Sequence, residues 1–93
     1  MISLRAIIRL SPAEEGGQGT DGFSGMQPSI LISGDLVACK IVPHESDVIK
    51  RGVEYNVMIE LPYGEIYSSK VFVGMKFSLN IGGKVIGNGV VVD

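Results

Sequence analysis

The residues best suited to chemistry in this chain are a histidine and two carboxylates that lie close together in sequence. His44, Glu45 and Asp47 combine an imidazole with two acids, and such groups bind metals and transfer protons. They fall in the hydrophilic stretch 43–52, and His44 is the only histidine. A single histidine in a charged loop is more typical of solvated surface. We therefore expect no metal, no cofactor and no enzymatic activity.

The other candidate groups do not form a catalytic set either. Cys39 is the only cysteine, which excludes an internal disulfide and a cysteine-cluster metal site. Its neighbours Ala38 and Ile41 are apolar, so we expect a small structural residue within a strand, in a reducing cytosol. Glu14 and Glu15 are adjacent, and in extended backbone they face opposite ways. They are expected to be loop charges.

A nucleotide site is also not expected. The chain lacks the Gly-x-x-x-x-Gly-Lys-Ser/Thr pattern that holds phosphate in a P-loop. Gly82, Gly83 and Lys84 have neither the earlier glycine nor the hydroxyl that would bind magnesium. Since Gly82 and Gly83 lie between two alternating runs, they predict a two-residue hairpin turn.

Length and composition favour one small globular domain, residues 1–93. A chain of 93 residues is too short to bury a second core. Hydrophobic residues make up 45% and charged residues 19%, a balance typical of compact proteins. The net charge of -2 disfavours RNA or tRNA, because nucleic-acid binders are usually basic. No apolar run approaches the roughly 20 residues that span a bilayer, so we expect a cytoplasmic protein with no membrane partner.

Alternation of apolar and polar residues predicts an all-β protein. The clearest run is 53–61, where alternate residues are predicted to face inward: Val53, Tyr55, Val57, Ile59 and Leu61. Similar patterns predict strands over the ranges 4–10, 29–33, 36–42, 71–81 and 84–92. In the range 71–81, Val73 and Ile81 are predicted to face inward and Asn80 to point out. Gly87 and Gly89 share one face of the last strand and indicate close backbone approach. About six antiparallel strands without a covering helix predict a small closed barrel filled by side chains, with no ligand cavity.

Two segments and one strand resemble the C-terminal β-barrel, domain three, of elongation factor Tu. Residues 14–28 are similar to the family's Glu-Gly-Gly-Arg-His-Thr-Pro-Phe-Phe-x-Gly-Tyr-Arg-Pro segment, and residues 82–91 to its Gly-Gly-Arg-Thr-Val-Gly-Ala-Gly-Val-Val segment. Residues 74–79 resemble the family's Gly-Leu-Arg-Phe-Ala-Ile strand. The resemblance covers nearly the whole chain and implies the same barrel as a stand-alone domain.

In the family this barrel packs against a GTP-binding domain and touches the T stem of aminoacyl-tRNA. The positions that the resemblance implies for these contacts carry other residues here. Ser29, Val37 and Asn80 replace a glutamine, a threonine and an arginine, while Gly82 is retained. The arginines on the side of the GTP-binding domain are replaced by Gln18 and Gln27, which cannot reproduce the bidentate contacts of an arginine fork.

These observations predict a non-catalytic binding module with a protein partner. The loop 11–27 holds five glycines and is long for a hairpin connection, as functional loops often are. We expect contacts from its polar and apolar side chains, next to the hairpin turn: Gln18, Thr20, Phe23, Met26, Gln27, Gly82 and Gly83. The alternative is that Phe23 and Met26 fold back and plug one barrel end.

Three further alternatives remain open from the sequence. The first is an RNA- or tRNA-binding translation factor that acts with a separate GTPase, which requires five cations to converge on one side: Arg5, Arg9, Lys70, Lys76 and Lys84. The second is a decoy of the elongation factor barrel that intercepts its partners. The third is a homo-oligomer formed through an exposed strand edge.

Overall fold

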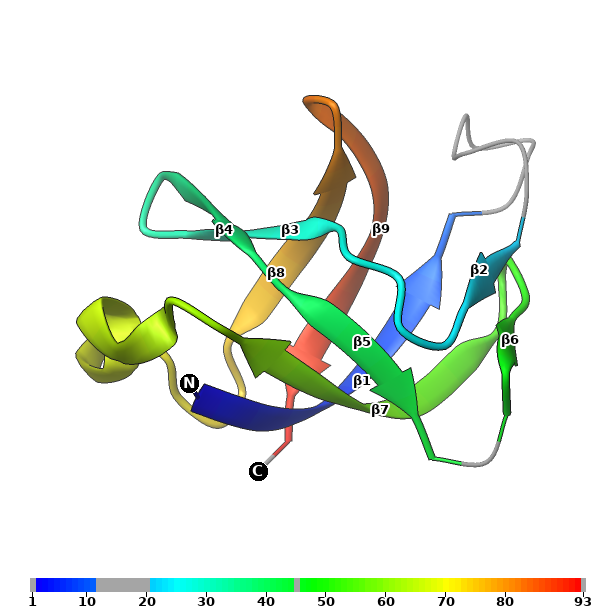
Figure 1. Ribbon diagram of the computed structural model, residues 1–93, viewed down its shortest axis with the longest axis horizontal. Coiled ribbons are helices and arrows are strands. Elements are labelled where there is room, and N and C mark those ends of the chain that lie inside the picture. The colour runs from blue at the N-terminus through cyan, green and yellow to red at the C-terminus, as the bar shows by residue number, and fades with distance from the viewer. Residues whose placement is uncertain (1, 12–20, 45, 93) are drawn as a thin grey trace.

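The computed structural model describes residues 2–11, 21–44 and 46–92, and in this part of the chain the fold is all-β, as predicted (Figure 1). The elements in chain order are β1 (Ile2–Leu10), β2 (Gly22–Phe23), β3 (Ser29–Ile32), β4 (Asp35–Ala38), β5 (Lys40–Pro43), β6 (Val48–Ile49), β7 (Glu54–Leu61), the 3-10 helix η2 (Gly64–Lys70), β8 (Lys76–Ile81) and β9 (Lys84–Val91). No helix among these residues is long and apolar enough to cross a membrane.

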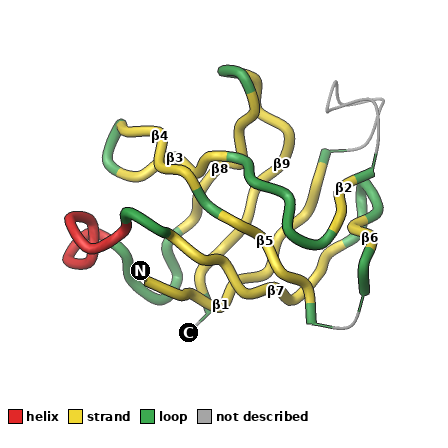
Figure 2. Tube along the Cα trace, in the orientation of Figure 1, coloured by secondary structure: helices red, strands yellow, loops and turns green. Residues whose placement is uncertain are grey.

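Seven strands form one antiparallel sheet in the order β4-β3-β8-β9-β1-β7-β5. The sheet curls strongly, so that the described chain forms a half-barrel (Figure 2). β1 pairs with β9 on one side and with β7 on the other, over registers that include Ile8 opposite Gly89 and Ile8 opposite Tyr55. A second sheet, β2 with β6, lies at one end of this half-barrel.

The prediction of a closed six-stranded barrel is wrong. The edges of the sheet are β4 and β5, which pair with β3 and β7 respectively but not with each other. They belong to the single strand predicted over 36–42, which is interrupted at Cys39. β7 ends at Leu61, because Pro62 lacks an N–H donor and the chain then turns into η2. The far side of β4 is therefore left without a strand partner in the described residues.

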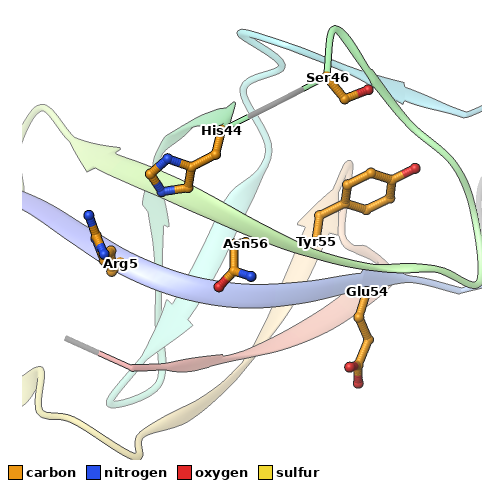
Figure 3. A pocket seen from close by; sticks show the side chains of 6 residues that line it. All are labelled: Arg5, His44, Ser46, Glu54, Tyr55 and Asn56. Carbon is orange, nitrogen blue, oxygen red and sulfur yellow. The ribbon is translucent and has the colours of Figure 1, made fainter.

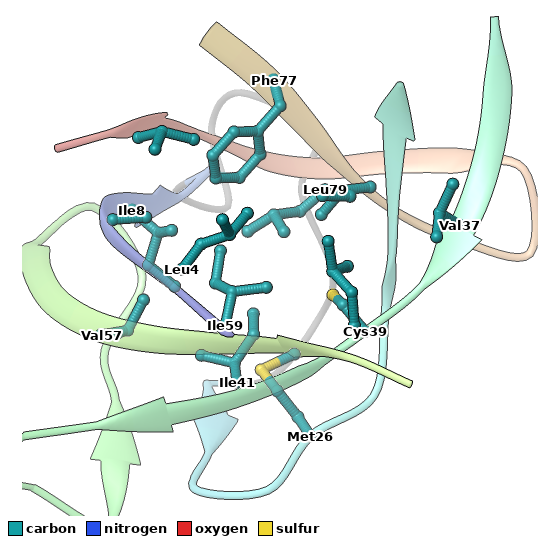
Figure 4. Packing of buried hydrophobic residues seen from close by; sticks show 14 of the residues in the cluster. Leu4, Ile8, Met26, Val37, Cys39, Ile41, Val57, Ile59, Phe77 and Leu79 are labelled. Atoms are coloured by element: carbon teal, nitrogen blue, oxygen red, sulfur yellow. The ribbon is translucent and has the colours of Figure 1, made fainter. Parts of the chain in front are cut away.

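The core lies on the concave side of the sheet and follows the predicted alternation (Figure 4). β1 contributes every second residue to it, and β7 does the same from Val57 onward. The buried apolar side chains are Leu4, Ala6, Ile8, Leu10, Met26, Ile30, Ile32, Val37, Cys39, Ile41, Ile49, Val57, Ile59, Leu61, Phe77, Leu79, Ile86 and Val91. Val53, predicted to be in this set, precedes β7 and is exposed.

The strand predicted over 71–81 is shorter than expected, and its faces change. β8 begins only at Lys76, and the preceding residues form η2 and a loop that the sequence did not predict as helical. The ladder with β9 shifts register between Leu79 and Asn80, at a β-bulge. An extra residue breaks the two-residue repeat of the strand that carries it, here β9, where Ile86 and Gly87 are both buried. At this shift Asn80 of β8 is buried and Ile81 is exposed, the reverse of the prediction.

The close approach predicted from the glycines of the last strand is confirmed. A Cβ on Gly87 would lie 2.6 Å from the carbonyl oxygen of Arg9, and one on Gly89 would lie 2.6 Å from Cζ of Phe77. Both glycines pair with β1, so β9 can lie this close to its neighbours only without side chains at these positions.

Candidate functional site

The small sheet of β2 and β6 presents an aromatic side chain to solvent. Phe23 lies opposite Val48, and both are exposed, with 60% of the Phe23 surface accessible. Gly22 lies opposite Ile49, which is buried. A Cβ on Gly22 would come within 2.7 Å of Sδ of Met26, so β2 can pack this closely against the core only with a glycine at this position. The result is an apolar pair on the outer face of a sheet whose inner face is packed.

Hydrogen bonds from separate segments hold this sheet in place. The backbone N–H of Arg51 donates to Oδ1 of Asp21 at 3.0 Å, and the side chains of the two residues form an ion pair at 3.7 Å. The N–H of Ser24 donates to the carbonyl of Asp47 at 2.9 Å, and the N–H of Gly25 donates to the carbonyl of Ile41 at 2.7 Å. Phe23 is thus presented by a constrained backbone.

Met26 and Gln27, predicted as contact residues beside Phe23, take different positions. Met26 is only 3% exposed and its side chain packs in the core beside Ile41 (Figure 4). Its carbonyl accepts a hydrogen bond from the N–H of Ile41 at 3.0 Å. The alternative interpretation, a residue that folds back into the barrel end, therefore holds for Met26 and does not hold for Phe23. Gln27 is exposed, whereas Gln18 and Thr20 lie outside the described residues.

Gly82 and Gly83 form the predicted turn between β8 and β9. Their φ angles are +58° and +80°, a region that favours glycine, and both residues are exposed. The N–H of Ser11 donates to the carbonyl of Ile86 at 2.8 Å, which places the start of the glycine-rich loop beside β9. Since a strand rises about 3.3 Å per residue, the turn projects about 10 Å beyond this bond. The glycine-rich loop therefore starts beside β9, about 10 Å from the hairpin tip.

A polar hollow of about 800 Å³ lies on the outer face of β1 and β7 (Figure 3). In Figure 3 the His44 imidazole and the Glu54 carboxylate lie on opposite sides of the Asn56 side chain. The backbone N–H of His44 donates to the carbonyl of Asn56 at 3.3 Å. The lining residues are Arg5, His44, Ser46, Glu54, Tyr55 and Asn56. The sequence prediction of a molecule without a cavity did not include this hollow.

The walls of this hollow are mostly open to water. Arg5, His44, Glu54 and Asn56 are exposed, and the Tyr55 hydroxyl accepts a hydrogen bond from the backbone N–H of Lys50 at 3.1 Å. Within the described ranges, no group of three or more His, Cys, Asp or Glu side chains could hold a metal ion. The hollow is lined by the Arg5 guanidinium, the Glu54 carboxylate and side chains that both donate and accept hydrogen bonds, and it suits weak polar contacts.

Cys39 lies in the core at the break between β4 and β5. Its thiol donates to the carbonyl of Pro28 at 3.3 Å, and burial raises its pKa to about 12. A thiol with so high a pKa stays protonated at neutral pH and is a poor nucleophile. The structure thus places Cys39 among structural residues.

Three of the five cations considered for RNA binding share one outer face. Arg5 and Arg9 lie on the convex side of β1. Lys76 of β8 lies two strands away on the same side, because it pairs with Val90 of β9 and Val90 pairs with Ile7 of β1. Glu54 lies directly opposite Arg9 on this face. The remaining two, Lys70 and Lys84, lie at the end of η2 and at the start of β9. The face carries both signs of charge.

The connection between β7 and β8 holds exposed apolar side chains that the sequence analysis assigned to no surface. They are Tyr63, Ile66, Phe72 and Val73. The prediction had placed Val73 on the inner face of a strand, because alternation continues through this loop. The Pro62-Tyr63-Gly64 run, with its turn-forming residues, was the one local signal of a break.

A scan against protein-family models finds no match for this chain. The resemblance to the elongation factor Tu barrel therefore stays a proposal, which stands on the residues that carry it.

Proposed function

We propose that this chain is a non-catalytic binding module, resembling the C-terminal barrel of elongation factor Tu, that binds a protein partner through its β2–β6 sheet and the adjoining glycine-rich loop. The observation that carries the proposal is the exposed Phe23 on a constrained two-stranded sheet. Aromatic side chains are enriched at protein interfaces and often dominate their binding energy.

The site around Phe23 has the composition of a small interface. Val48 extends the apolar contact, and Asp21, which directly precedes β2, adds a polar group beside it. Because the hydrogen bonds of Asp21, Ser24 and Gly25 already order the backbone, little ordering entropy is lost on binding. In this proposal the partner is a cytosolic protein, in keeping with a single free cysteine.

The test is affinity capture from a native lysate of the source organism with matched baits. Phe23→Ala removes the proposed anchor, and Phe72→Ala removes an equally exposed phenylalanine, 61% against 60%, at a different place. We expect the wild type and Phe72→Ala to retain the same protein and Phe23→Ala to lose it. Loss on Phe72→Ala with retention on Phe23→Ala would place the interface elsewhere.

An RNA- or tRNA-binding factor that acts with a separate GTPase is the second candidate, and the gathering of Arg5, Arg9 and Lys76 on one face favours it. Affinity that comes from phosphate contacts falls steeply with added salt. A filter-binding titration with tRNA that shows no binding at low salt removes this candidate.

A decoy of the elongation factor barrel is the remaining alternative within the proposal. Such a decoy competes with full-length elongation factor Tu for a shared partner. Failure to compete, with the partner still bound to this chain, leaves the dedicated binding module as the function.

A further inference from the structure

β4 is an edge strand whose outer backbone groups point away from the sheet. In a two-residue hairpin, the residues that flank the turn form a doubly hydrogen-bonded pair, and bonded pairs then alternate with non-bonded ones. Ile32 and Asp35 flank the turn between β3 and β4. The N–H and C=O groups of Leu36 and Ala38 therefore face the free side. In the described chain, no other strand pairs with β4, and no backbone hydrogen bond from a loop reaches these two residues.

The short helix η2 follows the end of β7 and lies on the open side of β4 (Figure 1). At its start, Gly64 is buried against Leu61 and Ile2, where a Cβ would come within 2.7 Å and 3.3 Å of their Cβ atoms. Further along, Tyr67 packs against the core, and its hydroxyl donates to Oδ2 of Asp35 at 3.2 Å. η2 is thus fixed to β1 and β7 at one end and to β4 at the other. Covering an exposed edge is a common way to prevent strands of two molecules from pairing.

We propose that η2 blocks the free edge of β4, and that it thereby prevents the same edge of a second copy of this chain from pairing with it. Leu36 is 54% exposed and lies directly opposite Leu31, which is also exposed. A two-fold antiparallel pairing centred on Leu36 makes the two Leu36 residues a doubly hydrogen-bonded pair. The leucines of both copies then form one apolar stripe across the shared outer face.

Charge and chain path also fit a second copy. In this register Asp35 faces Val37 of the second copy, so like charges do not oppose each other. Ala38 faces the turn residue Gly34 of the second copy, and the partner strand therefore ends before Lys40, where β5 begins to pair with β7. The edge accepts a strand of this length without displacing β7.

The test is sedimentation velocity over a wide concentration range with four proteins: the wild type, Tyr67→Ala, and Tyr67→Ala combined with either Leu36→Glu or Val85→Glu. We expect a monomeric wild type, because η2 is tied to Asp35 by Tyr67 and stands on the open side of the edge, and a concentration-dependent dimer for Tyr67→Ala. Leu36→Glu places two like charges at the two-fold axis and restores the monomer. Val85 has the same 54% exposure but lies on β9, so Val85→Glu leaves the dimer intact.

Two results overturn the proposal. One is a Tyr67→Ala protein that keeps its β-sheet circular dichroism and remains monomeric at every concentration, and the other is a dimer that survives Leu36→Glu. Should Tyr67→Ala fail to fold, Tyr67→Phe removes only the hydroxyl that donates to Asp35 and keeps the packed ring. That variant must still dimerise more strongly than the wild type, and a monomer there overturns the proposal equally.

Discussion

Replacing Gly87 by alanine tests the close packing of β9 against β1. The new Cβ would lie 2.6 Å from the carbonyl oxygen of Arg9 and 3.0 Å from Cα of Leu10. Carbon atoms are in optimal contact at about 3.5–4.0 Å, so the second distance is short by at least about 0.5 Å. Both obstructing atoms belong to the backbone of β1, which is held by β7 on its other side, and neither can rotate away.

We expect Gly87→Ala to lower the free energy of unfolding by about 3 kcal/mol, at the upper end of the range for overpacking. For a domain of this size each kcal/mol lowers the melting temperature by about 4–8 °C, which gives a fall of about 12–24 °C. With an m-value of about 1–3 kcal/mol/M, the urea midpoint falls by about 1–3 M.

Urea unfolding followed by far-ultraviolet circular dichroism measures this loss, with Gly83→Ala as the control. Gly83 has a φ of +80° and nothing within 4 Å of its ideal Cβ position, so alanine there carries only the left-handed backbone cost of about 1–2 kcal/mol. If Gly87→Ala proves no more destabilising than Gly83→Ala, the two strands do not approach as closely as described.

Three other predictions concern single side chains. Met26→Ala is expected to lower the free energy of unfolding by about 2–5 kcal/mol, because it opens a cavity in the core. Phe23→Ala is expected to change it by less than about 0.5 kcal/mol, because Phe23 is exposed. Equal losses for the two variants in thermal unfolding would contradict their different burial. Cys39 is expected to resist a thiol reagent in the folded protein and react in urea. Burial raises the pKa of Cys39 from 9.0 to about 12, so the thiol loses its proton at lower pH in the unfolded chain than in the folded protein. The free energy of unfolding should therefore be unaffected by this group below pH 9 and should fall between pH 9 and about 12. The Cys39→Ala variant should lack this part of the fall. Asp21→Ala is expected to lower the free energy of unfolding, measured by chemical denaturation, by about 0.5–1.5 kcal/mol, because it removes the acceptor of the Arg51 N–H. Asp21→Asn keeps an acceptor and should lower it less. An equal loss for both variants would point to the charge of Asp21 alone.

The candidate site could be predicted only in part, because apolar residues of one loop differ in whether they are buried or exposed. Phe23 and Met26 are both apolar and three positions apart, and no local pattern separates them. Their positions depend on partners elsewhere in the chain, since Phe23 pairs with Val48 of β6 while Met26 bonds to Ile41 of β5. The hollow beside His44 likewise arises where Arg5 of β1 meets residues of β7, which are remote in sequence.

The sequence by itself determined the features that depend on near neighbours. The alternation in β1 and β7 predicts the buried faces, and the glycines at 82 and 83 predict the turn, because side-chain direction and backbone freedom are local properties. The tertiary structure decided the features that depend on register and on which strands meet. At the register shift with β9, Asn80 and Ile81 of β8 take the faces opposite to those predicted, and the end of β7 before Pro62 leaves β4 as an edge beside η2. Alternation specifies which residues face inward but not where a ladder shifts or stops, because those points are set by long-range pairing between strands.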